Sequence, residues 1–223
     1  MTLEMFIFDE TPTDEVDRRE KAVGSLADSV RHLVDATIRS TVSDEEVLAV
    51  RDEVDALVAR LRAEQLPGPA GVRYNAEGRS WSWGNAVVGQ RNPVAPPLEI
   101  VHTGAGQAHA EVVLGAAYEG PPGMVHGGVA ALLLDQVMGE TASGFKRLTI
   151  TGTLTLRYRR GTPLGPLRIE SRIASEEGRK ITVEAHLAGP DGNPTVEATG
   201  LFLIPSWAPV DESDRGWTKF AEG

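Results

Sequence analysis

Twenty consecutive residues, GPPGMVHGGVAALLLDQVMG from Gly120 to Gly139, decide which fold this chain can form. Gly and Pro fill the first four positions, and such a run interrupts both strands and helices. From His126 to about Thr141 the residues are almost all apolar, Ala and Leu dominate, and a helix is predicted. Because apolar residues surround most of its circumference, this helix should be buried on several sides. At about 16 residues it is too short to cross a membrane comfortably.

Strand-like segments surround this helix in the sequence. Two segments precede it, at residues 98–101 and 108–114, and four follow it, at 148–159, 167–174, 180–188 and 195–204. Short turns that contain Gly or Asn separate the last four. This order predicts an α+β fold, in which one antiparallel sheet wraps around one long central helix.

The N-terminal part of the chain has a different pattern. Two series of apolar or small residues recur there at spacings of three and four, which predicts two helices within residues 1–66. The first series is Val23, Leu26, Val30, Leu33 and Thr37, and the second is Val47, Val50, Val54, Leu57 and Leu61. The Gly- and Pro-rich run at 66–71 is the expected boundary. We therefore predict a helical extension at 1–66, a domain at 72–205 and a loosely ordered polar tail at 206–223.

Composition excludes several classes of function. The net charge of −10 argues against nucleic acid as a partner, because binding to phosphate backbones depends on Lys and Arg. The chain has no cysteine, which excludes disulfides, thiolate nucleophiles and Cys-ligated metal sites. No apolar run is long enough for membrane insertion. We expect a cytoplasmic protein that holds no metal.

Two glycines at the predicted helix start indicate a possible site. Gly127 and Gly128 leave helix N-terminal amides unobstructed, and these amides can stabilise an anion or a developing oxyanion. The alternative is that the glycines only allow close packing of the helix on the sheet. His126 can donate a hydrogen bond to a substrate carbonyl, or it can cap the helix. The residues alone leave both questions open.

Asp135 lies in the middle of the apolar helix, directly after three leucines. A buried ionised carboxylate is costly unless it faces a cavity or a partner, and catalytic carboxylates often occupy such positions. The alternative is a narrow solvent-facing stripe that Asp135 shares with Gln136 and Glu140. Spacing does not decide between these interpretations.

The strand after the helix alternates, which predicts that Thr151, Thr153 and Thr155 share one face. Three hydroxyls that face the helix could hold a water molecule beside a carboxylate, although exposed Thr faces are also common in sheets. Three arginines, Arg157, Arg159 and Arg160, follow at the end of this strand. They suit a phosphate-bearing ligand, or they form a solvated edge that discourages aggregation.

Residues 120–139 resemble the hotdog-fold thioesterase superfamily. The resemblance is to the branch that contains 4-hydroxybenzoyl-CoA and phenylacetate-pathway thioesterases and the human thioesterase-superfamily members. It rests on the His-Gly-Gly at the helix start and on an Asp nine residues after the His. The stretches 92–98, 158–160 and 178–202 are also similar to this branch. The resemblance covers about residues 81–205, so the helical extension lies outside it.

This resemblance implies a hotdog fold and a reaction. It implies a homodimer with active sites at the interface, or a tetramer made of two such dimers. The reaction is hydrolysis of a fatty or aromatic acyl-CoA to the free acid and CoA, without a cofactor. Asp135 acts as nucleophile or general base, and the amides of Gly127 and Gly128 polarise the thioester carbonyl. A non-catalytic domain that binds acyl-CoA or lipid, or serves as a scaffold, is the alternative.

The resemblance also implies roles for other residues. Thr151 is the expected water-positioning residue, and Thr153 is the alternative. Some members carry an Asn shortly before the His, where this chain has Glu119-Gly120-Pro121. The expected substrate-binding residues are Asn92, Arg159, Arg160 and Lys180, the last three as contacts for CoA phosphates. The N-terminal helices either fold back on their own domain or dimer mate, or recruit a partner protein.

Overall fold

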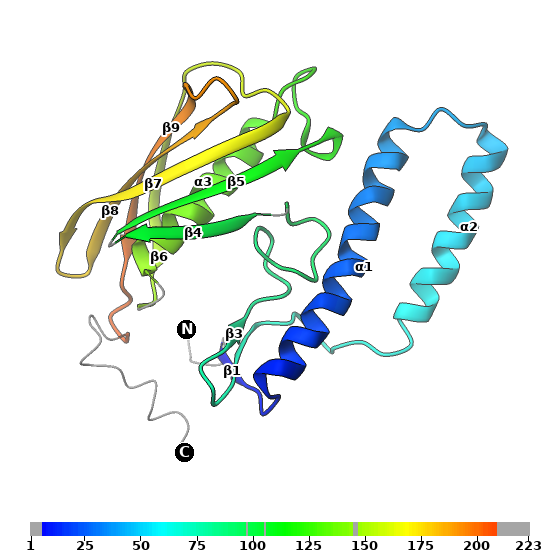
Figure 1. Cartoon of the computed structure of the whole chain (residues 1–223), viewed down its shortest axis with the longest axis horizontal. Coiled ribbons are helices and arrows are strands. Elements are labelled where there is room, and N and C mark those ends of the chain that lie inside the picture. Colours follow the sequence, from blue (N-terminus) through cyan, green and yellow to red (C-terminus); the bar gives the residue numbers. More distant parts are fainter. Residues whose placement is uncertain (1–5, 97, 105, 145–146, 209–223) are drawn as a thin grey trace. The chain divides into compact units, whose positions relative to one another are not determined.

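The computed structural model describes residues 6–96, 98–104, 106–144 and 147–208. It divides into two compact units, Met1–Pro93 and Val94–Gly223 (Figure 1). The predicted boundary at 66–71 therefore differs from the observed one, because residues 72–93 belong to the first unit. Most of the predicted C-terminal tail, residues 209–223, lies outside the described residues.

The second unit contains a six-stranded antiparallel sheet, in which all the predicted strands are present. Its strands are β4 (Glu99–Gly104), β5 (Gln107–Leu114), β6 (Ile150–Tyr158), β7 (Gly165–Glu177), β8 (Lys180–Ala188) and β9 (Pro194–Leu203). Their order in the sheet is β4-β5-β7-β8-β9-β6, so β4 and β6 form its two edges. The predicted α+β class is confirmed.

The long helix α3 (Gly127–Ser143) covers one face of this sheet, and Figure 1 shows it running along the strands. It follows a short 3₁₀ turn, η2 (Ala116–Tyr118), and ends at Gly144, whose φ of 55° is the left-handed conformation that favours glycine. Leu133 and Leu134 are completely buried. Each such leucine contributes about 1.5–3 kcal/mol to stability by its removal from water.

Two residues of β9 show which face of that strand meets α3. A Cβ atom added to Gly200 would lie 2.9 Å from the methyl carbon of Met138, so Gly200 faces the helix. Phe202 is also buried, and its ring lies 3.6 Å from the position that a Cβ of Gly139 would occupy. Because alternate residues of a strand share a face, Leu201 points to the opposite side.

The first unit contains the two predicted helices, α1 (Thr13–Arg39) and α2 (Asp44–Leu61). Ser43 caps α2, because its hydroxyl oxygen accepts a hydrogen bond from the amide of Glu46 at 3.3 Å. A small sheet of β1 (Phe6–Phe8), β2 (Val72–Tyr74) and β3 (Ser80–Trp81) completes the unit. No helix within the described ranges is both long and apolar enough to span a membrane.

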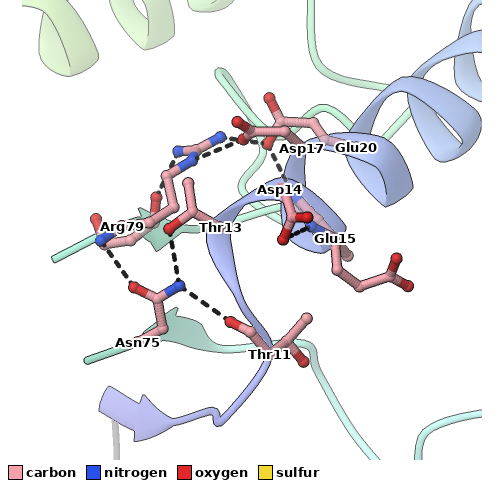
Figure 2. Close-up of polar contacts among 10 residues, drawn as sticks. Thr11, Thr13, Asp14, Glu15, Asp17, Glu20, Asn75 and Arg79 are labelled. Atoms are coloured by element: carbon pink, nitrogen blue, oxygen red, sulfur yellow. Dashed lines mark hydrogen bonds and ion pairs between the residues drawn. The ribbon is translucent and has the colours of Figure 1, made fainter. Parts of the chain in front are cut away.

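A buried asparagine ties this small sheet to the start of α1, as Figure 2 shows. The side-chain amide of Asn75 donates to Thr11 O at 3.0 Å and to Thr13 Oγ1 at 3.2 Å, and its oxygen accepts from the amide of Arg79. The guanidinium of Arg79 in turn pairs with Glu20 at 2.8 Å. These contacts explain why residues 72–80 fold with the N-terminal helices rather than with the large sheet.

Candidate active site

The segment that leads into α3 is fixed from both sides. The amide of His126 donates to Tyr118 O at 2.9 Å, and the amide of Gly120 donates to Met124 O at 2.8 Å. The carboxylate of Glu119 accepts from the amide of Gly123 at 2.7 Å. A Cβ atom on Gly120 would lie only 2.8 Å from the Cα of His126, so this close crossing of the chain requires glycine.

His126 is the N-cap residue of α3. Its Nδ1 atom accepts a hydrogen bond from the amide of Gly128 at 3.0 Å, so the neutral ring carries its proton on Nε2. A Cβ atom on Gly128 would lie 3.1 Å from Nδ1, which explains the glycine. The expectation that both amides are open is therefore wrong for Gly128. The amide of Gly127 has no hydrogen-bond acceptor within the described part of the chain.

Tyr158, at the end of β6, holds the carbonyl side of the same peptide. Its hydroxyl donates to Gly127 O at 2.9 Å, and its ring lies 3.4–3.5 Å from the position of a Gly127 Cβ. No role was predicted for Tyr158, which is known from the sequence only as part of the similar stretch 158–160. Its position shows that β6 braces the helix start.

Asp135 meets β6 further along α3. Its Oδ1 atom accepts a hydrogen bond from the hydroxyl of Thr151 at 2.9 Å. The side chains of Asp135, Gln136 and Glu140 are all partly buried, so they do not form the solvent-facing stripe that was the alternative. Burial raises the pKa of Glu140, and a hydrogen bond from Gln136 opposes this shift. The carboxylate–hydroxyl pair is thus a contact between helix and sheet.

A β-bulge decides which threonine faces the helix. Thr151 pairs with Phe202 and Thr153 pairs with Leu201, so Gly152 is an extra residue between the two pairs. Directly opposed residues share a face, and Phe202 faces α3. Thr151 therefore faces the helix, whereas Thr153 is exposed on the other side with Leu201. The predicted single face of Thr151, Thr153 and Thr155 is wrong because the bulge turns Thr151 over.

Two of the expected phosphate-binding residues are already paired with carboxylates. Arg159 contacts Glu197 at 2.7 Å, and Arg160 contacts Asp191 at the same distance. The hydrogen bond from Arg160 holds the pKa of Asp191 well below its usual range, and Asn193 adds to the effect. A phosphate at this position would have to compete with these carboxylates.

Lys180 and Asn92 lie elsewhere. Lys180 pairs with Leu203 at one end of β9. Arg159 lies at the other end of β9, where its amide donates to the carbonyl of Thr195. The three basic residues therefore do not form one cluster. Asn92 belongs to the first unit, where its side-chain amide donates to the carbonyls of two loop residues, Gly84 and Asn85, at 3.3 Å.

The chemistry open to the site is that of a carboxylate with an oriented hydroxyl and a free helix amide. Among the residues that the structure describes, no three His, Asp or Glu side chains are grouped in a way that could hold a metal ion. The carboxylate of Asp135 can take a proton from water or attack a carbonyl carbon directly. The amide of Gly127 can stabilise a negative oxygen.

Comparison with known proteins points to one family. The thioesterase superfamily profile matches residues 122–194. A crystal structure of a thioesterase superfamily protein aligns with a TM-score of 0.72 and 33% identity, over 81% of this chain and 90% of that one. This likeness confirms the predicted hotdog fold.

Curated relatives match a shorter stretch. The acyl-coenzyme A thioesterase THEM4 of Xenopus laevis is 35% identical over 91 residues, which are 40% of this chain and 41% of that protein. The protein of the same name from Bos taurus is 32% identical over 91 residues, or 37% of its length. The chain thus spans about two fifths of the length of these relatives.

Proposed function

The chain belongs to the thioesterase superfamily, and we propose that it hydrolyses an acyl-CoA thioester to a free acid and CoA. The observation that carries the proposal is the hydrogen bond between Thr151 and Asp135, which orients a carboxylate on a largely buried helix. The names of the THEM4 relatives, which are 32–35% identical to this chain over 91 residues, support the reaction. The acyl group is a fatty or aromatic chain in this proposal.

Asp135 is the group that starts the reaction. Thr151 donates to its Oδ1 atom, which leaves Oδ2 for the reaction. As a general base, Asp135 takes a proton from water while the water oxygen bonds to the carbonyl carbon. The carbonyl oxygen becomes an oxyanion, and its collapse breaks the carbon–sulfur bond and releases CoA as a thiolate, which is then protonated. As a nucleophile, Asp135 would bond to the carbonyl carbon and displace CoA as a thiolate, and water would then cleave the resulting acyl anhydride to the free acid and the Asp135 carboxylate.

The oxyanion needs a hydrogen-bond donor about 3 Å away, and the free amide of Gly127 can supply it. His126 supports this arrangement, because its Nδ1 accepts from Gly128 and its Nε2–H is therefore a second donor at the helix start. The imidazole thus caps the helix and presents a polar group in the same place. His126 can therefore cap the helix and donate a hydrogen bond to a substrate carbonyl in the same conformation.

Helix geometry supports a site that two chains share. Asp135 follows Gly127 by eight residues, which separates their backbones by about 12 Å along the axis. Groups that act on one carbonyl lie within roughly 7 Å of each other, since each approaches it to about 3–3.5 Å. Two copies with antiparallel α3 helices would bring Gly127 of one chain close to Asp135 of the other. The proposal therefore includes a homodimer with shared sites.

A panel of acyl-CoA substrates tests the proposal. The purified chain is mixed with fatty acyl-CoAs of increasing length and with aromatic acyl-CoAs, and released CoA is followed with a thiol reagent. We expect turnover of at least one of these classes. Measurement of binding to the same compounds distinguishes the alternative, because binding without CoA release would show a non-catalytic acyl-CoA-binding domain.

A further inference from the structure

We infer that Gly152 is a positioning residue for the reaction, because the bulge that it forms turns the hydroxyl of Thr151 toward Asp135. This inference rests on the proposed function and adds a residue to its site. Gly152 itself has no group that could touch a substrate. It acts through the direction in which the preceding residue, Thr151, faces.

The register of β6 and β9 shows what the extra residue does. From Thr153 to Tyr158 the strands pair without interruption, with Leu154 opposite Gly200 and Thr153 opposite Leu201. An uninterrupted ladder would continue with Gly152 opposite Phe202 and Thr151 opposite Leu203. Thr151 would then face away from α3, because a shift of one residue moves a side chain to the other face. The bulge restores Thr151 to the position opposite Phe202.

Space at the bulge is tight for any side chain at position 152. A Cβ atom on Gly152 would lie 3.1 Å from Cδ1 of Leu203 and 3.2 Å from the carbonyl oxygen of Leu201. The end of a leucine side chain can move, but the carbonyl oxygen belongs to the backbone of β9. The φ angle of Gly152 is not in the left-handed region, so contact rather than backbone conformation disfavours a side chain here. Alanine would therefore push β6 away from β9 beside Thr151.

A small displacement is enough to matter. β6 is an edge strand of this sheet, so β9 is the only strand that pairs with it among the described residues. The hydrogen bond from Thr151 to Asp135 is 2.9 Å long, and a shift of about 0.7 Å takes it beyond hydrogen-bonding distance. Misplacement of a group by about 1 Å can cost an enzyme on the order of 100-fold in rate.

A double-mutant cycle tests the inference, with Thr151→Ala, Gly152→Ala and the double variant. Each single change should lower kcat by about 10–100-fold and leave KM within about twofold, because neither residue is placed to contact CoA. Thr151→Ser should keep turnover, since it keeps the hydroxyl. The double variant should match Thr151→Ala, because Gly152 has nothing left to position once the hydroxyl is gone.

Gly104→Ala is the matched control. Gly104 also lies in a strand beside a register shift, but a Cβ there meets no atom within 4 Å, so kcat should stay at the wild-type value. Melting temperatures are recorded for every variant. A wild-type kcat for Gly152→Ala would overturn the inference. A kcat of the double variant clearly below that of Thr151→Ala would also overturn it, and this is the result expected if Gly152→Ala merely unfolds the protein. A wild-type protein that releases no CoA would instead contradict the proposed function itself.

Discussion

The imidazole of His126 folds back over the first turn of α3, and its Nδ1 atom lies 3.0 Å from the amide nitrogen of Gly128. One ring thus satisfies a helix amide with one nitrogen and can offer a proton with the other. Gly127, between these two residues, keeps its own amide free within the described chain. At the helix start, the amide of Gly128 is thus used in a structural hydrogen bond, whereas the amide of Gly127 is available to a ligand in the proposed reaction.

The two roles of His126 can be separated by substitution. His126→Ala removes the cap and should lower the free energy of unfolding by about 1 kcal/mol, whereas His126→Asn supplies another good capping oxygen and should keep it near wild type. Both variants lose Nε2–H, so both should show lower kcat. Urea unfolding and CoA-release assays measure the two effects. Equal stability of the Ala and Asn variants would contradict the capping role.

Proline at position 127 tests the free amide. Proline lacks the N–H group but is favoured at the first position of a helix, and His126 already has a φ of −60° and a ψ of 132°, which suit a residue before proline. We expect Gly127→Pro to keep the melting temperature and to lower kcat by about 10²–10³-fold, as loss of an oxyanion donor does. A proline variant with wild-type kcat would show that this amide does not act on the substrate.

Mixed dimers test the shared site. If Asp135 of one chain works with Gly127 of the other, a dimer of one Gly127→Pro chain and one Asp135→Asn chain contains one intact site and one doubly altered site. Co-expressed and doubly tagged heterodimers should then recover about half of the wild-type activity, although each parent is nearly inactive. Heterodimers as inactive as their parents would indicate that both groups act within one chain.

We expect the buried carboxyl of Glu140 to make the stability of the folded protein depend on pH. Burial raises the pKa of its carboxyl in the folded protein, so the folded state holds this proton more tightly than the unfolded state. Stability is therefore lost as pH rises from the unfolded pKa, near 4.5, through the raised folded value. Glu140→Gln should be more stable than wild type at pH 7, and the difference should vanish at pH values below 4.5. Melting temperatures of both proteins across this pH range provide the measurement. A Glu140→Gln variant less stable than wild type at pH 7 would contradict the prediction.

Much of the fold could be predicted because its signals are local. Alternation marks the strands, and the Ala- and Leu-rich stretch marks α3, within a few residues of the observed bounds. The domain boundary could not be placed in this way. It depends on the parallel pairing of Phe6–Phe8 with Val72–Tyr74 and on the hydrogen bonds of Asn75, which join residues far apart in the sequence.

Only some contacts of the candidate site follow from the sequence. Asp135 and Thr151, both expected site residues, form a hydrogen bond, but the predicted alternation of the threonines is wrong because pairing with β9 sets the bulge. A glycine inside a strand was the available signal, since it often marks a bulge. The capping of Gly128 by His126 depends on a side-chain rotation that the sequence does not specify.

The most direct test of the account is the turnover of Asp135→Asn, measured as CoA release from the best substrate of the panel. The amide is nearly the same size as the carboxylate and can still accept a hydrogen bond from Thr151, so the fold should persist. Without a group that can take a proton or attack the carbonyl, kcat should fall by about 10²–10⁴-fold or more. An Asp135→Asn protein that releases CoA at the wild-type rate would contradict the account.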